Sequence, residues 1–134
     1  MTVEYSEGMR FVGHGGSGHE IVMDAGPQSG GQDTAARPVE VLLAALGGCT
    51  GMDVVLILRK SKHVPAAFRI EIQDERATEY PQVLKKIHLA YVFSPDVPRD
   101  RAEKAIELSL AKYCPIANSL AGVAEITHEL RFEG

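Results

Sequence analysis

The feature that most constrains the fold is an apolar stretch over residues 41–58, in which Asp53 is the only charged residue. Pro38 suits the first turn of a helix, and Glu40 favours the positive end of the helix dipole. Basic residues follow the stretch, at the end that the dipole favours: Arg59, Lys60 and Lys62. We therefore predict one long helix over residues 38–62, about 37 Å in length.

A stretch of this length also reaches the threshold for a membrane span. Asp53 near the middle of a span costs about 2.5–3.5 kcal/mol on the insertion scale, and the flanking segments read as amphipathic strands, so we expect no membrane partner. A helix that is apolar on every side must be buried on every side. One sheet covers only one side, so we expect an obligate homodimer with this helix near the interface.

Alternating apolar and polar residues predict strands on both sides of the long helix. The expected strands cover residues 3–11, 19–24, 68–73, 87–93 and 124–132. This order of elements predicts an α+β fold, with antiparallel sheet wrapped around helices, in a single domain over residues 1–134. In the last strand, His128 falls on the apolar side and is expected to be a hydrogen-bonded core histidine.

A second helix is predicted over residues 98–114, because apolar or small residues recur there at helical spacing. This stripe consists of Ala102, Ala105, Ile106, Ser109, Leu110, Tyr113 and Cys114. Cys114 is therefore expected to point inward. Pro115 cannot donate a backbone hydrogen bond, so the helix ends or kinks there.

Composition excludes several function classes. The formal charge is −4 and the pI is about 5.7, which argues against a nucleic-acid partner. The N-terminus carries acidic residues and no apolar run, so no targeting peptide is expected and the predicted location is cytoplasmic. Two cysteines 65 positions apart are not a disulfide scaffold. The five histidines form no pair at ligand spacing, so no bound metal or cofactor is predicted.

The two cysteines, Cys49 and Cys114, are the residues most able to do chemistry. Cys49 lies among Gly47, Gly48 and Gly51, and each glycine inside a helix costs about 0.8–1 kcal/mol relative to alanine. Glycines there let another group approach closely beside the thiol. Cys49 is therefore either a nucleophile at a helix crossing or a buried structural cysteine. If the two helices pack together, both thiols lie within disulfide reach and form a redox pair.

A reactive cysteine must form a thiolate. Cys49 lies more than two turns from the helix start, and Asp53 on the same face disfavours a second negative charge. A cation must therefore come from another segment. Arg10, Arg37 and His19 in the N-terminal segment are the candidates, and the residues alone do not choose among them.

The run Pro38-Val-Glu-Val-Leu-Leu-Ala-Ala-Leu-Gly-Gly-Cys49-Thr-Gly-Met-Asp resembles the OsmC/Ohr family, the osmotically inducible and organic-hydroperoxide-resistance proteins. The later Tyr-Cys114-Pro-Ile resembles that family's second cysteine motif, and the likeness is greatest to its small OsmC-like branch. The resemblance implies antiparallel sheets around two central long helices in an intertwined homodimer. It also implies a peroxidase that acts on organic hydroperoxides or hydrogen peroxide. By this resemblance Cys49 becomes a sulfenic acid, Cys114 resolves it as a disulfide, and an external dithiol reduces the pair.

One position departs from the family pattern. Better-known members carry a glutamate directly after the proline, partnered by an arginine, whereas this chain has Val39 there and Glu40 one residue later. Nine residues turn a helix by about 180°, so Glu40 is expected to point away from Cys49 unless it acts across a dimer. The family's arginine has no clear counterpart in this sequence, and Arg10 and Arg37 are the two candidates for its place. The alternative function is a non-catalytic binding or carrier protein for a small apolar ligand at the dimer interface; a disulfide or acyl-transfer enzyme using Cys49 alone is a third.

Overall fold

The structure is a computed structural model that describes residues 1–134. The chain divides into two compact units, Met1–Ala44 and Ala45–Gly134. Each unit contains one three-stranded sheet. The α+β fold class expected from the order of elements is therefore confirmed, whereas the single domain and the homodimer stay predictions.

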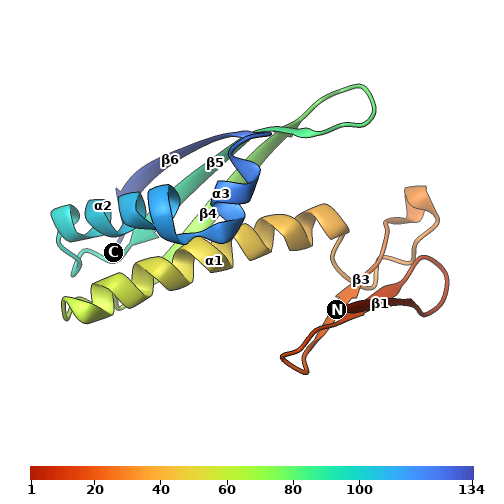
Figure 1. The fold of residues 1–134 in the computed structure, drawn as a ribbon, viewed down its shortest axis with the longest axis horizontal. Helices are drawn as coiled ribbons and strands as arrows, with labels where there is room; N and C mark the ends of the chain where they lie inside the picture. The colour runs from red at the N-terminus through yellow and green to blue at the C-terminus, as the bar shows by residue number, and fades with distance from the viewer. The chain divides into compact units, whose positions relative to one another are not determined.

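The first unit holds a meander of three short antiparallel strands, which Figure 1 draws in red and orange. They are β1 (Thr2–Tyr5), β2 (Phe11–His14) and β3 (Glu20–Met23). A connection that contains the 3₁₀ turn η1 (Pro27–Ser29) then leads to the long helix. Strand β3 lies within the predicted segment 19–24, whereas the predicted segment 3–11 is divided: it holds most of β1 and only the first residue of β2.

The long helix α1 spans Pro38–Lys60, two residues shorter than predicted. Its buried residues repeat every four positions and form one narrow stripe: Leu46, Thr50, Val54 and Leu58. By length and composition alone α1 could cross a membrane, because its mean hydropathy is 2.2 over an 18-residue window. Only 22% of that window is buried. Much of the apolar surface of α1 is therefore uncovered in this chain.

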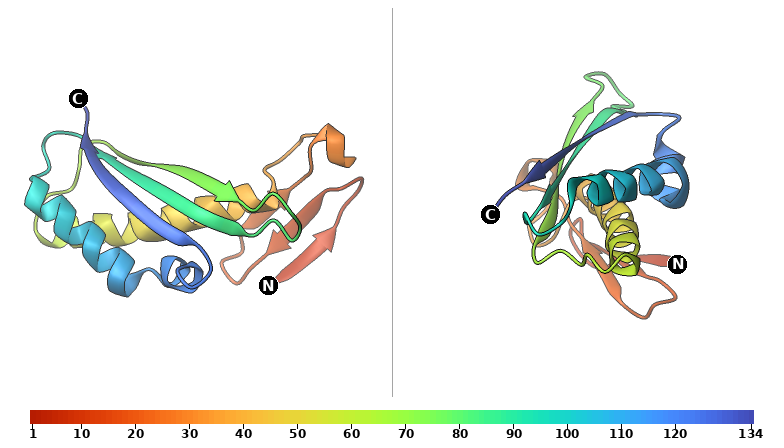
Figure 2. Two further views of the ribbon diagram at one scale, coloured as in Figure 1. Left: turned by 90° about the horizontal axis from the view of Figure 1, so that it is seen from above. Right: turned by 90° about the vertical axis from the view of Figure 1, so that its left-hand side faces the viewer.

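The second unit has the strand order β4–β5–β6, built from Phe68–Arg76, Leu84–Phe93 and Glu125–Phe132. The pair β4–β5 is an antiparallel hairpin. The expectation of antiparallel sheet is wrong for the other pair, since β6 lies parallel to β5. The chain between them passes through helices that return it to the starting end of β5, and such a crossover produces parallel strands. Figure 2 shows these helices and the second unit's part of α1 on one face of the sheet.

The predicted second helix is divided into two parts, and a further short helix follows it. The α-helix α2 (Arg99–Leu108) continues into a π-helical turn, η2 (Ser109–Tyr113), and α3 (Pro115–Leu120) follows after Cys114. Pro115 ends the helix, as predicted. Tyr113 does not continue the buried stripe and is 50% exposed, because the wider π turn shifts the register of the last residues. Cys114 is fully buried, as predicted.

The glycines of α1 allow the helix to lie close to the sheet. A Cβ built on Gly47 would lie 2.9 Å from Cδ1 of Ile72 on β4, and one on Gly51 would lie 3.4 Å from Cδ1 of Ile70. Strand β4 therefore occupies the space that side chains at these positions would fill. This packing offsets the cost of glycine inside a helix, whereas Gly48 has no neighbour within 4 Å.

Replacing Gly47 with valine is expected to lower the free energy of unfolding by about 1–3 kcal/mol, the usual cost of overpacking a core. The added methyl groups collide with Ile72. Urea denaturation of Gly47→Val, Ile72→Ala and the double variant measures this cost. Ile72→Ala should recover part of the loss in the Gly47→Val background; purely additive effects would show that the collision is not with Ile72.

Candidate functional site

The candidate site is a pair of free cysteines in the second unit. Cys49 is half-buried on α1, and Cys114 is fully buried at the junction of η2 and α3. Two backbone hydrogen bonds fix Cys114: its N–H donates to the carbonyl oxygen of Ser109 (2.8 Å), and its Sγ accepts from the N–H of Ala117 (3.3 Å). The fold thus brings together two residues 65 positions apart.

The thiol of Cys114 is held in its protonated form. Burial raises its pKa to about 11, and a hydrogen bond with the Cys49 side chain adds to the rise, whereas the N–H of Ala117 opposes it. Cys49 raises the pKa of Cys114 through this hydrogen bond and through its charge, and both effects require the two side chains to lie close together. In a site of this kind the more exposed thiol is the one available for attack, and the buried thiol is available to react with it.

A chain of buried hydroxyl groups lies beside the two cysteines. The Oγ1 atom of Thr50 lies 2.8 Å from the hydroxyl of Tyr91 and 2.7 Å from Oγ of Ser109. Ser109 Oγ in turn donates to Oδ2 of Asp53, at 2.9 Å. Thr50, Tyr91 and Ser109 are each fully buried. The chain joins α1, strand β5 and the π turn through side chains alone.

In this series of hydrogen-bonded hydroxyl groups, the donor and the acceptor of every bond can be assigned. An ionised carboxylate only accepts, so Ser109 must donate its single hydroxyl hydrogen to Asp53. Thr50 must then donate to Ser109, and Tyr91 must donate to Thr50. Burial raises the pKa of Tyr91 to about 12; the hydrogen bond with Thr50 opposes the rise, and the negative charge of Asp53 adds to it. Tyr91 therefore stays a donor at any physiological pH.

The remaining candidates lie in the first unit, where Glu40, Arg37 and Arg10 have local partners, and the backbone N–H of His19 donates to Oγ of Ser17 (3.3 Å). The carboxylate of Glu40 accepts a hydrogen bond from the backbone N–H of Arg37 (2.8 Å), which caps the start of α1. Arg37 forms an ion pair with Asp33 (2.8 Å). Arg10 donates to Oγ1 of Thr34 (2.9 Å). Action of any of these residues on Cys49 stays a prediction.

Thr34 connects Arg10 to the buried carboxylate of Asp24. Oδ2 of Asp24 accepts from Oγ1 of Thr34 (2.6 Å) and from its backbone N–H (3.0 Å), and Oδ1 accepts from the N–H of Ala25 (2.7 Å). These hydrogen bonds, those from Thr34 first, lower the pKa of Asp24 from 3.8 to about 2. Arg10 therefore belongs to a hydrogen-bond network in which Asp24 is ionised at neutral pH.

Acid should weaken the fold through Asp24 in a defined range. Because the pKa is lower in the folded chain than in the unfolded one, the carboxylate stabilises the fold above pH 4, and this contribution is lost as the pH falls through about 2. Carboxyl-carbon NMR shifts measure the pKa directly. Thr34→Val should move it up towards 3.8 while Thr78→Val leaves it unchanged; titration of wild-type Asp24 near 3.8 would contradict the assignment.

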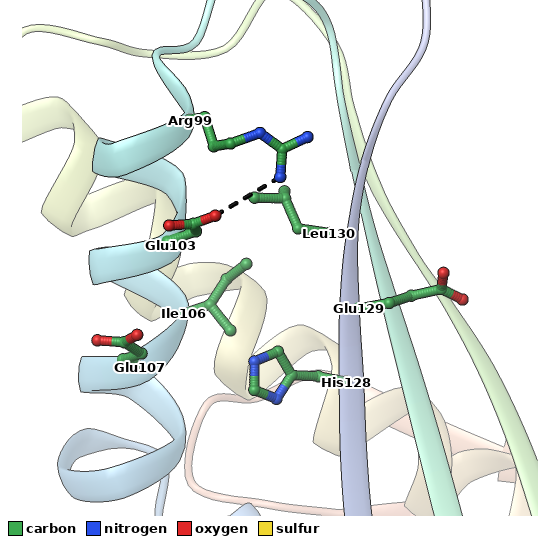
Figure 3. A pocket seen from close by; sticks show the side chains of 7 residues that line it. All are labelled: Arg99, Glu103, Ile106, Glu107, His128, Glu129 and Leu130. Carbon is green, nitrogen blue, oxygen red and sulfur yellow. Dashed lines mark ion pairs between the residues drawn. The ribbon is translucent and has the colours of Figure 1, made fainter.

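His128 is not the hydrogen-bonded core histidine that its strand position predicted. Its side chain is exposed and lines two cavities of about 310 and 390 Å³ beside β6. Figure 3 shows its ring on the side of β6 that faces Ile106 and Glu107, whereas Glu129 points to the other side. Its inward position is as predicted, with its ring edge-on to Tyr91. Because the two cavities lie beside it, the His128 ring lacks the close packing of a core residue.

Sequence reasoning found both cysteines and missed the hydroxyl chain. The helical pattern places Ser109 on an apolar stripe, and the strand and helix patterns give Tyr91 and Thr50 no role in the site. One signal was available: buried polar groups must find hydrogen-bond partners. Three hydroxyl groups on predicted buried faces, with Asp53 in an otherwise apolar helix, together indicate a connected network.

Comparisons with known proteins give consistent results. The family model described as OsmC-like protein matches residues 30–129. Protein YhfA of Escherichia coli strain K12 is 37% identical over 127 residues, which is 94% of this chain and 92% of YhfA. A crystal structure of a hypothetical protein from Aquifex aeolicus VF5 has 27% identity and a TM-score of 0.81, covering 99% of this chain and 96% of that one.

A more distant structure shares the fold. The organic hydroperoxide resistance protein from Elizabethkingia anophelis has 17% identity and a TM-score of 0.72, covering 99% of this chain and 97% of that one. At this identity the likeness concerns the fold alone. The first two relatives, by contrast, are similar in sequence along nearly their whole length.

Proposed function

This chain belongs to the OsmC-like family, and from that premise we propose that it is a thiol-dependent peroxidase for small hydroperoxides. The observation that carries the proposal is the juxtaposition of a half-buried thiol, Cys49, with a fully buried one, Cys114. The organic hydroperoxide resistance protein from Elizabethkingia anophelis, which shares the fold, supports the same reaction class.

In the proposed reaction the Cys49 thiolate attacks one peroxide oxygen. The O–O bond breaks, Cys49 becomes a sulfenic acid, and the alkoxide leaves and takes up a proton as an alcohol. The Cys114 thiol then attacks the sulfenic sulfur, which forms the Cys49–Cys114 disulfide and releases water. An external dithiol reduces the disulfide by exchange and is itself oxidised to a disulfide. Electrons therefore pass from the dithiol to the peroxide.

The first experiment counts thiols per chain before and after one equivalent of cumene hydroperoxide. We expect two thiols to disappear together and peptide mapping to find an intrachain Cys49–Cys114 disulfide. Cys114→Ser, run alongside, should stop at a sulfenic acid on Cys49 and proceed to the sulfinic acid with excess peroxide. If both wild-type thiols survive excess peroxide for minutes, the peroxidase proposal fails and the carrier alternative becomes the better one.

Two further parts of the proposal concern partners and place. We propose that the chain works as a homodimer, because much of the apolar surface of α1 is uncovered in one chain. We also propose that it acts in the cytoplasm, where dithiol reductants keep cysteines reduced. No nucleic acid, membrane, metal or bound cofactor takes part in the proposed reaction.

A further inference from the structure

Both cysteines are attached to the same buried hydrogen-bond chain. Thr50 directly follows Cys49 in α1, and the backbone carbonyl oxygen of Ser109 accepts from the backbone N–H of Cys114 at 2.8 Å, so each cysteine is one backbone step from a hydroxyl residue of the network. The two attachment points are joined by the 2.7 Å hydrogen bond between Thr50 Oγ1 and Ser109 Oγ. Side-chain hydrogen bonds from Ser109 to Thr50 and to Asp53 therefore connect the segment that carries Cys114 to the helix that carries Cys49.

We propose that Thr50 and Ser109 are positioning residues that hold Cys114 at the distance from which it closes a disulfide with Cys49. The proposal deepens the proposed peroxidase function and rests on it for the step that is accelerated. Neither hydroxyl reacts with peroxide or sulfur in this scheme. Their effect is to raise the effective concentration of one thiol at the other.

The backbone around Cys114 explains why an anchor is needed. Cys114 leaves the helix in an extended conformation (φ −80°, ψ 106°), and Pro115 after it has no N–H to donate. The π turn that precedes it closes through the same Cys114 N–H bond to Ser109. π-Helical turns are rare in proteins, and many of those that occur lie at functional sites. Ser109 is thus the residue through which this irregular segment is fixed to α1.

The direction of the hydrogen bonds makes Thr50 the central member. It accepts from Tyr91 and donates to Ser109, and Ser109 donates to Asp53. Loss of the Thr50 hydroxyl leaves Tyr91 without an acceptor and Ser109 Oγ without a donor. Loss of the Tyr91 hydroxyl, by contrast, leaves the contact between Thr50 and Ser109 in place.

The step concerned is closure of the disulfide. The sulfenic acid of Cys49 and the thiol of Cys114 form one S–S bond and one water molecule, in which the leaving hydroxyl takes the thiol proton. No additional oxidant is required, because the peroxide has already oxidised Cys49. A longer distance between the sulfurs slows this step and also weakens the disulfide at equilibrium, so the proposal has a kinetic and a thermodynamic test.

The thermodynamic test is the reduction potential of the Cys49–Cys114 pair, measured in glutathione buffers. Thr50→Val keeps the shape of the side chain and removes the hydroxyl, and we expect it to weaken disulfide formation about tenfold, which is about 30 mV towards more oxidising values. Thr50→Ser restores the hydroxyl and should return the potential close to wild type. Thr127→Val, the same exchange on the exposed face of β6, is the matched control.

The kinetic test uses cumene hydroperoxide and a dimedone trap for sulfenic acid. Thr50→Val should slow disulfide closure about tenfold and accumulate trapped Cys49, while Thr50→Ser closes at the wild-type rate. If the wild-type chain forms no sulfenic acid, the peroxidase proposal fails and the glutathione measurement still tests the positioning.

An unchanged potential in Thr50→Val, or equal shifts in Thr50→Val and Thr50→Ser, would overturn the positioning role. If Thr50→Val does not fold, Ser109→Ala removes the same side-chain contact from the other side and keeps the backbone carbonyl that accepts from Cys114. We then expect a shift in the same direction, and no shift in Ser109→Ala would contradict the proposal.

Discussion

Replacing Cys49 with serine is expected to abolish consumption of cumene hydroperoxide, with a loss of at least about a thousandfold in turnover, because a serine hydroxyl without a neighbouring base is a far weaker nucleophile than a thiolate. The exchange alters one atom in a half-buried position, so the fold should be retained. Consumption in the presence of a dithiol, followed by a peroxide dye assay, measures the loss.

Cys114→Ser is the matched control for this prediction. It should carry out the first attack at the wild-type rate and then lose activity within a few turnovers, because no second thiol protects the sulfenic acid. A Cys49→Ser chain that still consumes peroxide would show that Cys49 is not the attacking thiol. A Cys114→Ser chain that is inactive from the first turnover would show that Cys114 takes part in the first attack and does not only resolve the sulfenic acid.

The second large effect concerns the surface of α1. Met52 and Leu56 lie one helical turn apart and are 75% and 49% exposed, on a helix that is mostly apolar. If a second copy covers this face, the double variant Met52→Glu/Leu56→Glu buries four charges at a symmetric interface. At about 1.5–3 kcal/mol for each buried apolar side chain, we expect the dimer to weaken by at least about a thousandfold.

Sedimentation velocity over a range of protein concentrations measures this change. The wild-type chain should sediment as a dimer at micromolar concentration and the double variant as a monomer. Val123→Glu, at another exposed apolar residue outside α1, should leave the dimer intact. A wild-type chain that is monomeric at tens of micromolar, or a double variant that remains dimeric, would remove the dimer from the proposed function.

The hydrophobic pattern predicted the elements of this fold better than their directions. The alternation of apolar and polar residues in the last strand predicts that Ile126 and Leu130 lie on the inner face. The same alternation is expected whether the strand runs parallel or antiparallel to β5. The direction is determined by the two helices and the π turn that carry the chain across the sheet. The π turn itself has no hydrophobic signature, so the exposure of Tyr113 could not be predicted.

For the site, the sequence predicted the cysteines because thiols are rare and their surroundings are unusual. The order of the hydroxyl chain could not be predicted, since Thr50, Tyr91 and Ser109 come from three elements whose packing sets their distances. Glu40 illustrates a different limit of pattern reading. Its place near the helix start indicates both a cap and a family role, and the hydrogen bond to the Arg37 N–H accounts for the first.

The parallel pairing of β5 and β6 has a consequence for synthesis of the chain on the ribosome. Strand β5 can pair with β4 as soon as the hairpin has been made, but its other edge waits until the helical crossover and the last strand, Glu125–Phe132, have emerged. An unpaired strand edge is a template for association with other chains. The nascent protein is therefore most prone to aggregate after β5 has emerged and before β6 has paired with it, and a chain truncated before β6 keeps that open edge permanently.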